Sequence, residues 1–360
     1  MATSTIGIQK PSSPVPHQTM LNKNMQERIA GFLFVAPGLI IVLLFVFVPM
    51  IYAFFISFTK WTGLQPPSEA PYVGLENYQM LLTQDGYIRT DFFLALKNTI
   101  YYVLGVVPTQ TILALLLAMI VNQKFLKGRG FFRTAFYFPS ITSSVVISMI
   151  FLWMFNRFGI VNYFIGQLAA PLGGYTPITW LNDPHGLFQN FLALFGITIA
   201  NAPAWVKTNI LGQTIWQWIS GPSVTMMTIM LLNIWTTSGT LMIIFLAALQ
   251  DIPAQLYEAA AVDGANNWQR FRYITVPQLR PTTFFVVTIG LIGTFQVFDQ
   301  VYVISKGAPA GTTEVVAWIA YRNAFNDSKA GLGAATAFVL FVLIMIFTVM
   351  QRRLVGSRQE

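Results

Sequence analysis

Long apolar stretches alternate with short polar ones along this chain. A membrane's hydrocarbon core is about 30 Å thick, and a helix crosses it with about 20 apolar residues. Six nearly uncharged runs reach that length, which predicts an all-α membrane protein with six transmembrane helices. The runs span about residues 30–58, 98–121, 134–155, 222–250, 282–304 and 330–350.

The two ends of the chain are polar. Residues 1–29 contain several Pro and Ser residues and are expected to be a disordered tail, and residues 351–360 form a second short tail. The run that follows the first tail is longer than the core of a signal peptide, so it is expected to stay in the membrane as a helix. Pro37 and Pro49 are expected to kink this helix or to mark its ends.

The distribution of Lys and Arg predicts the orientation. With six spans, one side of the membrane receives residues 1–29, 122–133, 251–281 and 351–360, which hold 13 of the 21 Lys and Arg residues. The short loop "NQKFLKGRGFFR" holds four basic residues and no acid. Because short cytoplasmic loops are rich in Lys and Arg, both termini are expected to be cytoplasmic.

The remaining loop of note is an insertion at residues 156–221, expected on the outer face. It is longer than a simple turn, and its stretch "GLFQNFLALFGITIANAPAW" contains an apolar run of only about 10 residues, which suits an interfacial or re-entrant segment. Trp residues around it fit a membrane interface. Packing of the insertion on the outer face is favoured over a role in gating.

Composition agrees with a membrane protein and narrows its chemistry. Of the residues, 55% are hydrophobic and only 9% are charged, against roughly 25% charged in soluble domains. The sequence contains no Cys and two His, so we expect no disulfide and no metal site. The net charge of +8 is attributed to the Lys and Arg residues that set the orientation of the chain in the membrane. We therefore expect membrane lipid around the chain and no nucleic acid as a partner.

The polar stretch between the fourth and fifth runs has the signals of a helical hairpin. Helix-forming residues lead to Asp263 and Gly264, where Gly can adopt the left-handed conformation that ends a helix. Asn266 or Asn267 can cap a second helix, which Pro277 is expected to end. The sequence therefore predicts a helix–turn–helix at residues 251–281 on the cytoplasmic face, with small alanines that allow another protein to approach closely.

The same stretch resembles the EAA loop of ABC importer permeases. That motif reads EAA, three residues, Gly, nine residues, Ile, one residue, Leu-Pro, and six of its seven fixed positions match here; Val276 stands in place of Leu. By this resemblance, short coupling helices of the loop sit in a cleft of a cytoplasmic ATPase. The residues assigned to coupling are Glu258, Ala259, Ala260, Asp263, Gly264, Ile274 and Pro277.

Further stretches are similar to the carbohydrate branch of this family, in particular to the first permease subunit of maltose and glycerol-phosphate importers. They include "FVAPGLIIVLLFVFVPMIYAFFISFT", "GLENYQMLL", "LKNTIYYV", "RGFFRTAFYFPSITSSVVISMIFLWMF" and "FQVFDQVYVIS". The likeness covers roughly residues 28–352. It implies the type I ABC importer permease fold and a place in the inner (plasma) membrane of a bacterium.

The resemblance also implies partners. They are a second homologous permease, two cytoplasmic ATPase subunits that bind ATP and Mg, and an extracytoplasmic solute-binding protein. The sequence itself contains no G-x-x-x-x-G-K-[ST] phosphate loop and no recognisable catalytic motif. We therefore expect no cofactor and no enzymatic activity in this chain, with ATP hydrolysis in partner subunits.

Polar residues within the apolar runs are candidates for a substrate path. Asn233, Trp235 and Thr236 lie near the middle of the fourth run, where amides, hydroxyls and an aromatic ring could bind a sugar. Packing between helices is an equally good explanation, since Ser, Thr and Asn often bond between spans. Gln296 and Asp299 form a second cluster in the fifth run; Asp299 is placed about 27 Å along that helix, near the outer headgroups.

The absence of Lys and Arg from the spans favours a neutral sugar, oligosaccharide or polyol over an anion such as glycerol phosphate. The competing class is an ion-coupled secondary transporter. Such carriers are typified by inverted repeats and intramembrane ionisable relays, and a single Asp near the outer surface supports this class poorly.

Overall fold

The computed structural model describes residues 20–123 and 126–355. The described residues fall into two compact units, divided between Ala53 and Phe54, and are mostly helical. The longer helices are α1 (Met20–Val42), α2 (Val48–Ile56), α4 (Tyr87–Asn122), α5 (Arg129–Ile141), α6 (Ser144–Met154), α7 (Ile160–Ala169), α10 (Val224–Asp251), α11 (Ala254–Val262), α14 (Arg280–Phe295) and α17 (Ala330–Val355). Shorter ones are α3 (Glu76–Leu82), α8 (Leu187–Ala193), α9 (Ile215–Ile219), α12 (Asn267–Arg270), α13 (Val276–Gln278), α15 (Asp299–Ile304) and α16 (Val316–Tyr321).

Of the six expected spans, five are single helical segments long and apolar enough to cross a membrane within the described ranges. The sixth is the third run, which is a pair of helices bent by 99°. Pro139 lies in the last turn of α5, and Thr142 and Ser143 then take extended backbone angles before α6 begins. Because Pro cannot donate to the helical ladder, and the residues after it are Ser and Thr, the helix ends inside the apolar run.

The first span also differs from its expected bounds. Helical structure already begins at Met20, so residues 20–29 are helical, while the rest of the expected disordered tail lies outside the described residues. Pro37 lies within α1, and a π-helical turn, Leu43–Phe47, precedes Pro49. A widened turn of this kind accommodates a residue that lacks a backbone N–H, so neither proline ends the span.

The segment from the fifth span to α17 holds structure that the apolar runs did not reveal. The fifth span ends as α14 at Phe295, and a new short helix, α15, starts at Asp299. The assumption of one unbroken helix up to Asp299 is therefore wrong, while the position of Asp299 near the outer headgroups stays a prediction. The loop after α15 folds into α16 and a π turn, Arg322–Asn326, that packs on α17.

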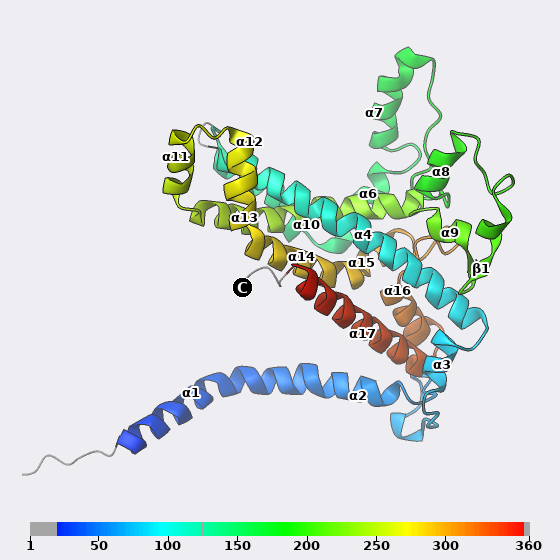
Figure 1. Cartoon of the computed structure of the whole chain (residues 1–360). Coiled ribbons are helices and arrows are strands. Elements are labelled where there is room, and N and C mark those ends of the chain that lie inside the picture. Colours follow the sequence, from blue (N-terminus) through cyan, green and yellow to red (C-terminus); the bar gives the residue numbers. More distant parts are fainter. Residues whose placement is uncertain (1–19, 124–125, 356–360) are drawn as a thin grey trace, which may run out of the picture. The chain divides into compact units, whose positions relative to one another are not determined.

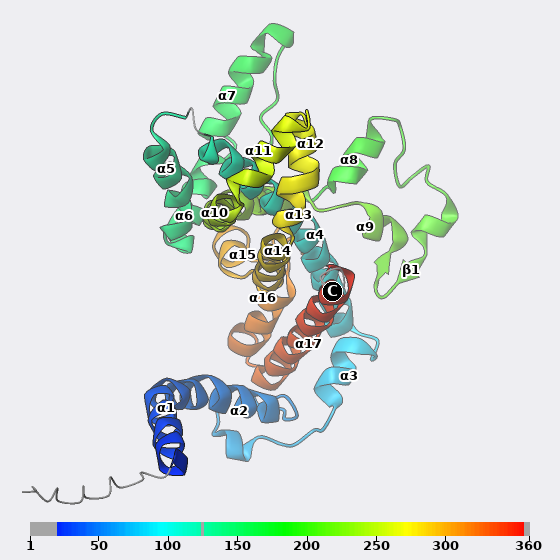
Figure 2. The same ribbon diagram turned by 60° about the vertical axis from the view of Figure 1, so that its left-hand side comes forward.

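In residues 54–360, α4 is the central helix: it packs against α10 on one side and α14 on another, and α17 packs on α14 and α16. Apolar side chains such as Tyr102, Phe245 and Phe295 are completely buried between these helices. Figure 1 shows α10 running between the outer elements α8 and α9 and the hairpin α11–α12 at its other end. In Figure 2, α10 is seen nearly end-on with α5 and α6 beside it.

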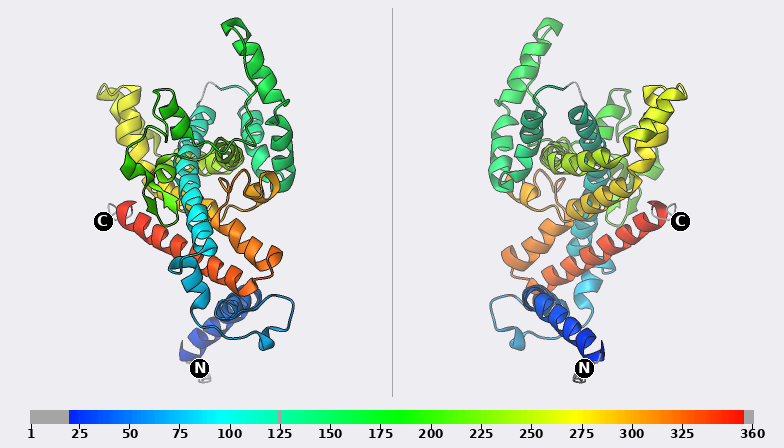
Figure 3. Two further views of the ribbon diagram at one scale, coloured as in Figure 1. Left: turned by 90° about the vertical axis from the view of Figure 1, so that its right-hand side faces the viewer. Right: turned by 90° about the vertical axis from the view of Figure 1, so that its left-hand side faces the viewer.

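The insertion at 156–221 contains α7, α8, α9 and a two-stranded antiparallel hairpin, β1 (Asn209–Ile210) and β2 (Gln213–Thr214). Asn162, which is buried, organises its first half: its amide donates to the carbonyls of Arg157 and Ile178, and its oxygen accepts from Trp180 Nε1 at 2.9 Å. The apolar run expected at the interface holds only one short helix, α8. Helix α7 projects from the rest of this unit (Figure 3).

A charged cluster fixes the loop before α16 to α4. Arg322 forms ion pairs with Asp91 of α4 and with Glu314, and these three side chains are only 10–16% exposed. Next to them the Asn98 amide donates to the carbonyls of Gly311 and Glu314, both at 2.9 Å. Burial, helped by the neighbouring Asp91 carboxylate, raises the pKa of Glu314 to about 8.

The raised pKa of Glu314 predicts how stability depends on pH. The folded state holds a proton on Glu314 up to about pH 8, whereas the unfolded chain releases it near its ordinary value of 4.5, so stability falls as pH rises through this interval. We expect Glu314→Gln, which mimics the protonated acid, to reduce the loss of melting temperature between pH 6 and 8 by about 2–4 °C. Equal pH dependence in both proteins would contradict a raised pKa.

Candidate functional site

The hairpin between α10 and α14 is built by local backbone signals. Helix α11 ends at Asp263, and Gly264 follows with φ of +76°. The next amide, that of Ala265, donates to the Ala260 carbonyl at 2.8 Å, which closes the end of the helix. The predicted stop at Asp263 and Gly264 is confirmed.

The second helix of the hairpin begins with a reciprocal cap. The Asn266 side chain accepts from the Gln269 amide at 2.9 Å, and the Gln269 side chain accepts from the Asn266 amide at 2.7 Å. Pro277 was expected to end this helix, and the helical stretch does end at Gln278, one residue later. A π turn, Phe271–Thr275, precedes Pro277, and α13 continues with only one turn residue before α14.

The hairpin exposes apolar and small side chains together. Val262 is 89% exposed, Tyr273 is 74% exposed and Trp268 is 67% exposed. The Tyr257 hydroxyl bonds to Thr275 Oγ1 at 2.9 Å and links the two helices. The residues assigned to coupling spread over this surface: Glu258, Ala259, Asp263 and Gly264 are exposed, and Ala260, Ile274 and Pro277 are partly buried.

A second candidate site lies where α5 and α6 meet at the bend. A pocket of about 230 Å³ opens there between these helices, α10 and α15. No Asp, Glu, Lys or Arg lines it, and no group of three or more His, Asp or Glu in the described ranges could hold a metal. Its lining is Pro139, Ser140, Thr142, Ser144, Ile147, Thr236, Thr237, Thr240 and Gln300.

Close packing of α5 on α10 forms one wall of this pocket. Ser140 Oγ donates to the Thr236 carbonyl at 2.6 Å. The approach depends on Gly239, because a Cβ at this position would lie 2.2 Å from the Phe136 carbonyl oxygen and 2.7 Å from Ser140 Oγ. A larger residue at Gly239 would push α5 away and change the pocket.

The structure places the five residues assigned to the substrate path in different surroundings. Thr236 lines the pocket, whereas Asn233 accepts from the Thr237 hydroxyl at 3.2 Å and the ring of Trp235 stacks on Phe151. Gln296 and Asp299 are exposed at the break between α14 and α15, and neither lines the pocket.

Several lining residues were not assigned to the path from the sequence. They are Ser140, Thr142, Ser144, Thr240 and Gln300. The signal was present as "PSITSS" in the middle of the third apolar run, a proline followed by four hydroxyl residues. Irregular backbone at membrane depth is tolerated where it is buried in protein or lines a cavity, so such a stretch predicts a cavity.

Comparisons with known proteins agree with this architecture. Residues 110–358 match the family described as "Binding-protein-dependent transport system inner membrane component". The chain is 29% identical over 336 residues to the probable ABC transporter permease protein YurN of Bacillus subtilis, covering 93% of this chain and 99% of YurN. It is 30% identical over 335 residues to the arabinooligosaccharides transport system permease protein AraP of the same organism, covering 92% and 90%.

A solved structure shows the same fold. A chain from a bacterial ABC transporter involved in the import of the acidic polysaccharide alginate superimposes with a TM-score of 0.69 at 21% identity, covering 95% of this chain and 100% of that one. The long match at the sequence level, together with this fold, shows that the chain belongs to the family of inner membrane permease components of binding-protein-dependent ABC transport systems.

Proposed function

We propose that this chain forms, with a second homologous permease, the membrane path of an ATP-driven importer for a neutral sugar, oligosaccharide or polyol. The pocket at the α5–α6 bend carries the proposal. Its hydroxyl groups and the Gln300 amide can exchange hydrogen bonds with a polyhydroxyl solute, and it offers no cation to a phosphate. The glycerol-phosphate alternative is therefore disfavoured.

The names of relatives support the same solute class. AraP serves arabinooligosaccharides, and a relative in Thermococcus litoralis, 29% identical over 336 residues, is a trehalose/maltose transport system permease protein. The structural neighbour imports an acidic polysaccharide, but a likeness of 21% identity supports the fold alone. The solute class thus rests on the pocket and on these relatives together.

The exposed hairpin supports the proposed partners on the cytoplasmic side. Two ATPase subunits that bind ATP and Mg would receive α11 and α12 of this chain and the equivalent loop of the second permease. The coupling contacts would come from Glu258, Ala259, Ala260, Asp263 and Gly264, with Ile274 and Pro277 fixing the second helix. An extracytoplasmic solute-binding protein would deliver the solute, and both termini would be cytoplasmic, as the Lys and Arg distribution predicts.

Thr240→Val tests the pocket. Thr240 lines it and is exposed, and Val keeps nearly the same shape while removing the hydroxyl. Loss of one hydrogen bond to solute costs about 1 kcal/mol, so we expect uptake per assembled complex to fall about fivefold. The measurement is uptake of a labelled neutral oligosaccharide by proteoliposomes that contain ATP and the binding protein.

Thr109→Val is the matched control, since Thr109 is an exposed threonine on α4 that does not line the pocket. Basal ATPase activity and melting temperature should stay unchanged in both variants. If both Thr240→Val and Thr109→Val transport the solute normally, the pocket is not the solute path. If both lose uptake equally, the effect is a general one on the membrane helices and the pocket assignment also fails.

A further inference from the structure

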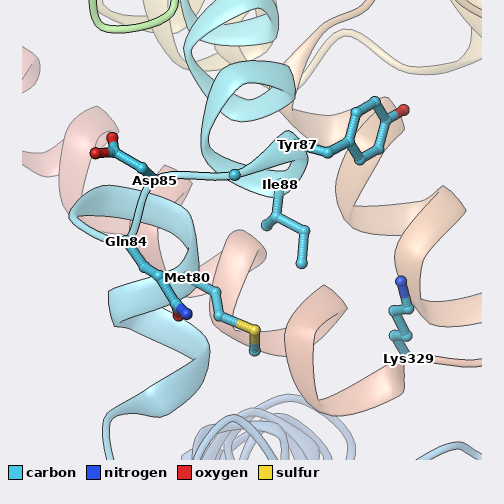
Figure 4. A pocket seen from close by; sticks show the side chains of 7 residues that line it. Met80, Gln84, Asp85, Tyr87, Ile88 and Lys329 are labelled. Carbon is cyan, nitrogen blue, oxygen red and sulfur yellow. The ribbon is translucent and has the colours of Figure 1, made fainter.

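Two adjoining pockets lie away from the proposed solute path, among α3, α4 and α17. One of about 340 Å³ is lined by Met80, Gln84, Asp85, Gly86, Tyr87, Ile88 and Lys329 (Figure 4). The other, of about 240 Å³, is lined by Lys60, Trp61, Thr62, Asn77, Met80, Ile88, Ser328, Lys329 and Leu332. They share Met80, Ile88 and Lys329, and we call the two together the Lys329 pocket.

The Lys329 pocket lies at the ends of membrane-spanning helices. Lys60 follows shortly after the last residue of α2, Ile56, while Ile88 is in the first turn of α4 and Leu332 in the first turn of α17. Lys60 lies two residues after the first apolar run, and Lys329 lies one residue before the last one. Because residues at the ends of apolar runs lie near the lipid headgroups, these two lysines are expected at that level.

Its charge is positive. Within the described ranges, the ammonium groups of Lys60 and Lys329 have no ion-pair or hydrogen-bond partner, although both residues line the pocket. Asp85, the one acid that lines the larger pocket, is paired with Arg89, and Asp327, two residues before Lys329, is paired with Arg322 at 3.8 Å. In Figure 4 the Asp85 carboxylate points away from Lys329. Two free cations favour an anionic ligand.

Two polar side chains of the smaller pocket are already bonded within the protein. The Asn77 amide donates to the carbonyls of Ser57 and Thr59 at 2.8 and 2.9 Å, and Trp61 Nε1 donates to the Gln65 carbonyl at 2.7 Å. A sugar would find few free partners there. What remains is an apolar floor of Met80, Ile88 and Leu332 below two ammonium groups.

We propose that the Lys329 pocket binds the phosphate group of an anionic phospholipid, with the start of an acyl chain on the apolar floor. The phosphate would lie between Lys60 and Lys329, and Gln84 and Tyr87 at the more open end would meet the glycerol headgroup. The argument rests on charge, because each lysine ammonium near the membrane surface adds attraction to an anionic lipid headgroup. This site is independent of the solute and of the coupling hairpin.

Native mass spectrometry of the full chain, purified with its partner subunits, tests the site. The probe is an equimolar mixture of phosphatidylglycerol and phosphatidylcholine, which differ in net charge but share acyl chains. We expect preferential retention of phosphatidylglycerol, and a fall in that preference of about fivefold for each lysine replaced in Lys60→Gln and Lys329→Gln. Lys207→Gln, a lysine of the outer insertion, should leave the preference unchanged.

The double variant Lys60→Arg with Lys329→Arg keeps both charges and should keep the preference, which separates loss of charge from loss of folding. Unchanged preference in the Lys→Gln double variant would overturn the site, as would loss of preference in the Arg variant with a normal melting temperature. A third arm adds inorganic phosphate in large excess. If free phosphate displaces the phospholipid fully, the pocket is a site for soluble phosphate and the assignment to lipid is wrong.

Discussion

Ala260→Trp is expected to abolish solute uptake while the protein still inserts into the membrane. Ala260 is partly buried in α11, beside the exposed Ala259, and its carbonyl accepts the hydrogen bond that closes this helix. An indole at this small face would hold an ATPase subunit away from the hairpin. The closure of the ATPase subunits on nucleotide would then no longer move the transmembrane helices. The measurements are uptake by proteoliposomes and co-purification of the ATPase subunits.

The size of the side chain, and not the loss of alanine, should decide the result. Ala260→Ser is therefore the matched control and should retain near-normal uptake. Gly264→Val tests the same hairpin through its backbone: a Cβ there would meet no atom of the described chain within 4 Å, but φ of +76° strains a β-branched residue by about 1 kcal/mol or more. Normal uptake and ATPase binding in Ala260→Trp would exclude the hairpin as the coupling site.

Arg322→Met is expected to cause the largest loss of stability. Methionine keeps an apolar stem of similar length but leaves the Asp91 and Glu314 carboxyl groups, both nearly buried, without their cation. Removing one partner of a buried ion pair typically costs about 3–5 kcal/mol. The amount of assembled complex and its melting temperature should both fall.

A triple variant shows whether charge is the cause. Adding Asp91→Asn and Glu314→Gln to Arg322→Met removes both orphaned carboxylates and should recover most of the melting temperature. No recovery would mean that Arg322 acts through packing of its stem on α4. A single Arg322→Met variant as stable as the wild type would contradict the ion-pair cluster altogether.

Apolar length was enough to locate the spans, because hydrocarbon thickness is a strong constraint on any chain that crosses it. It was also enough for the hairpin, where Gly264 and Asn266 give local backbone signals that need no tertiary contact. The break of the third run at Thr142 was not predicted, because a count of apolar residues does not show where the hydrogen bonds of a helix end.

The candidate solute pocket was only partly predictable. Thr236 was assigned from its depth in the fourth run, but Ser140 and Gln300 reach the same cavity from α5 and α15, and no single run shows which helices meet. The cluster around Arg322 was missed for the same reason: Asp91 and Glu314 are far apart in sequence and meet only because α16 packs on α4.

The bend between α5 and α6 has a consequence for how selective the pocket can be. The last turn of α5 and the first turn of α6 leave carbonyl and N–H groups without helical partners, and in a membrane these must be satisfied by polar neighbours. In the proposed solute path, water would satisfy these groups when no solute is bound. A solute would replace that water with its own hydroxyl groups, an exchange of nearly equal hydrogen bonds. On this proposal the pocket would accept any polyhydroxyl molecule that fits, and discrimination between one sugar and another would arise mainly before the solute reaches it.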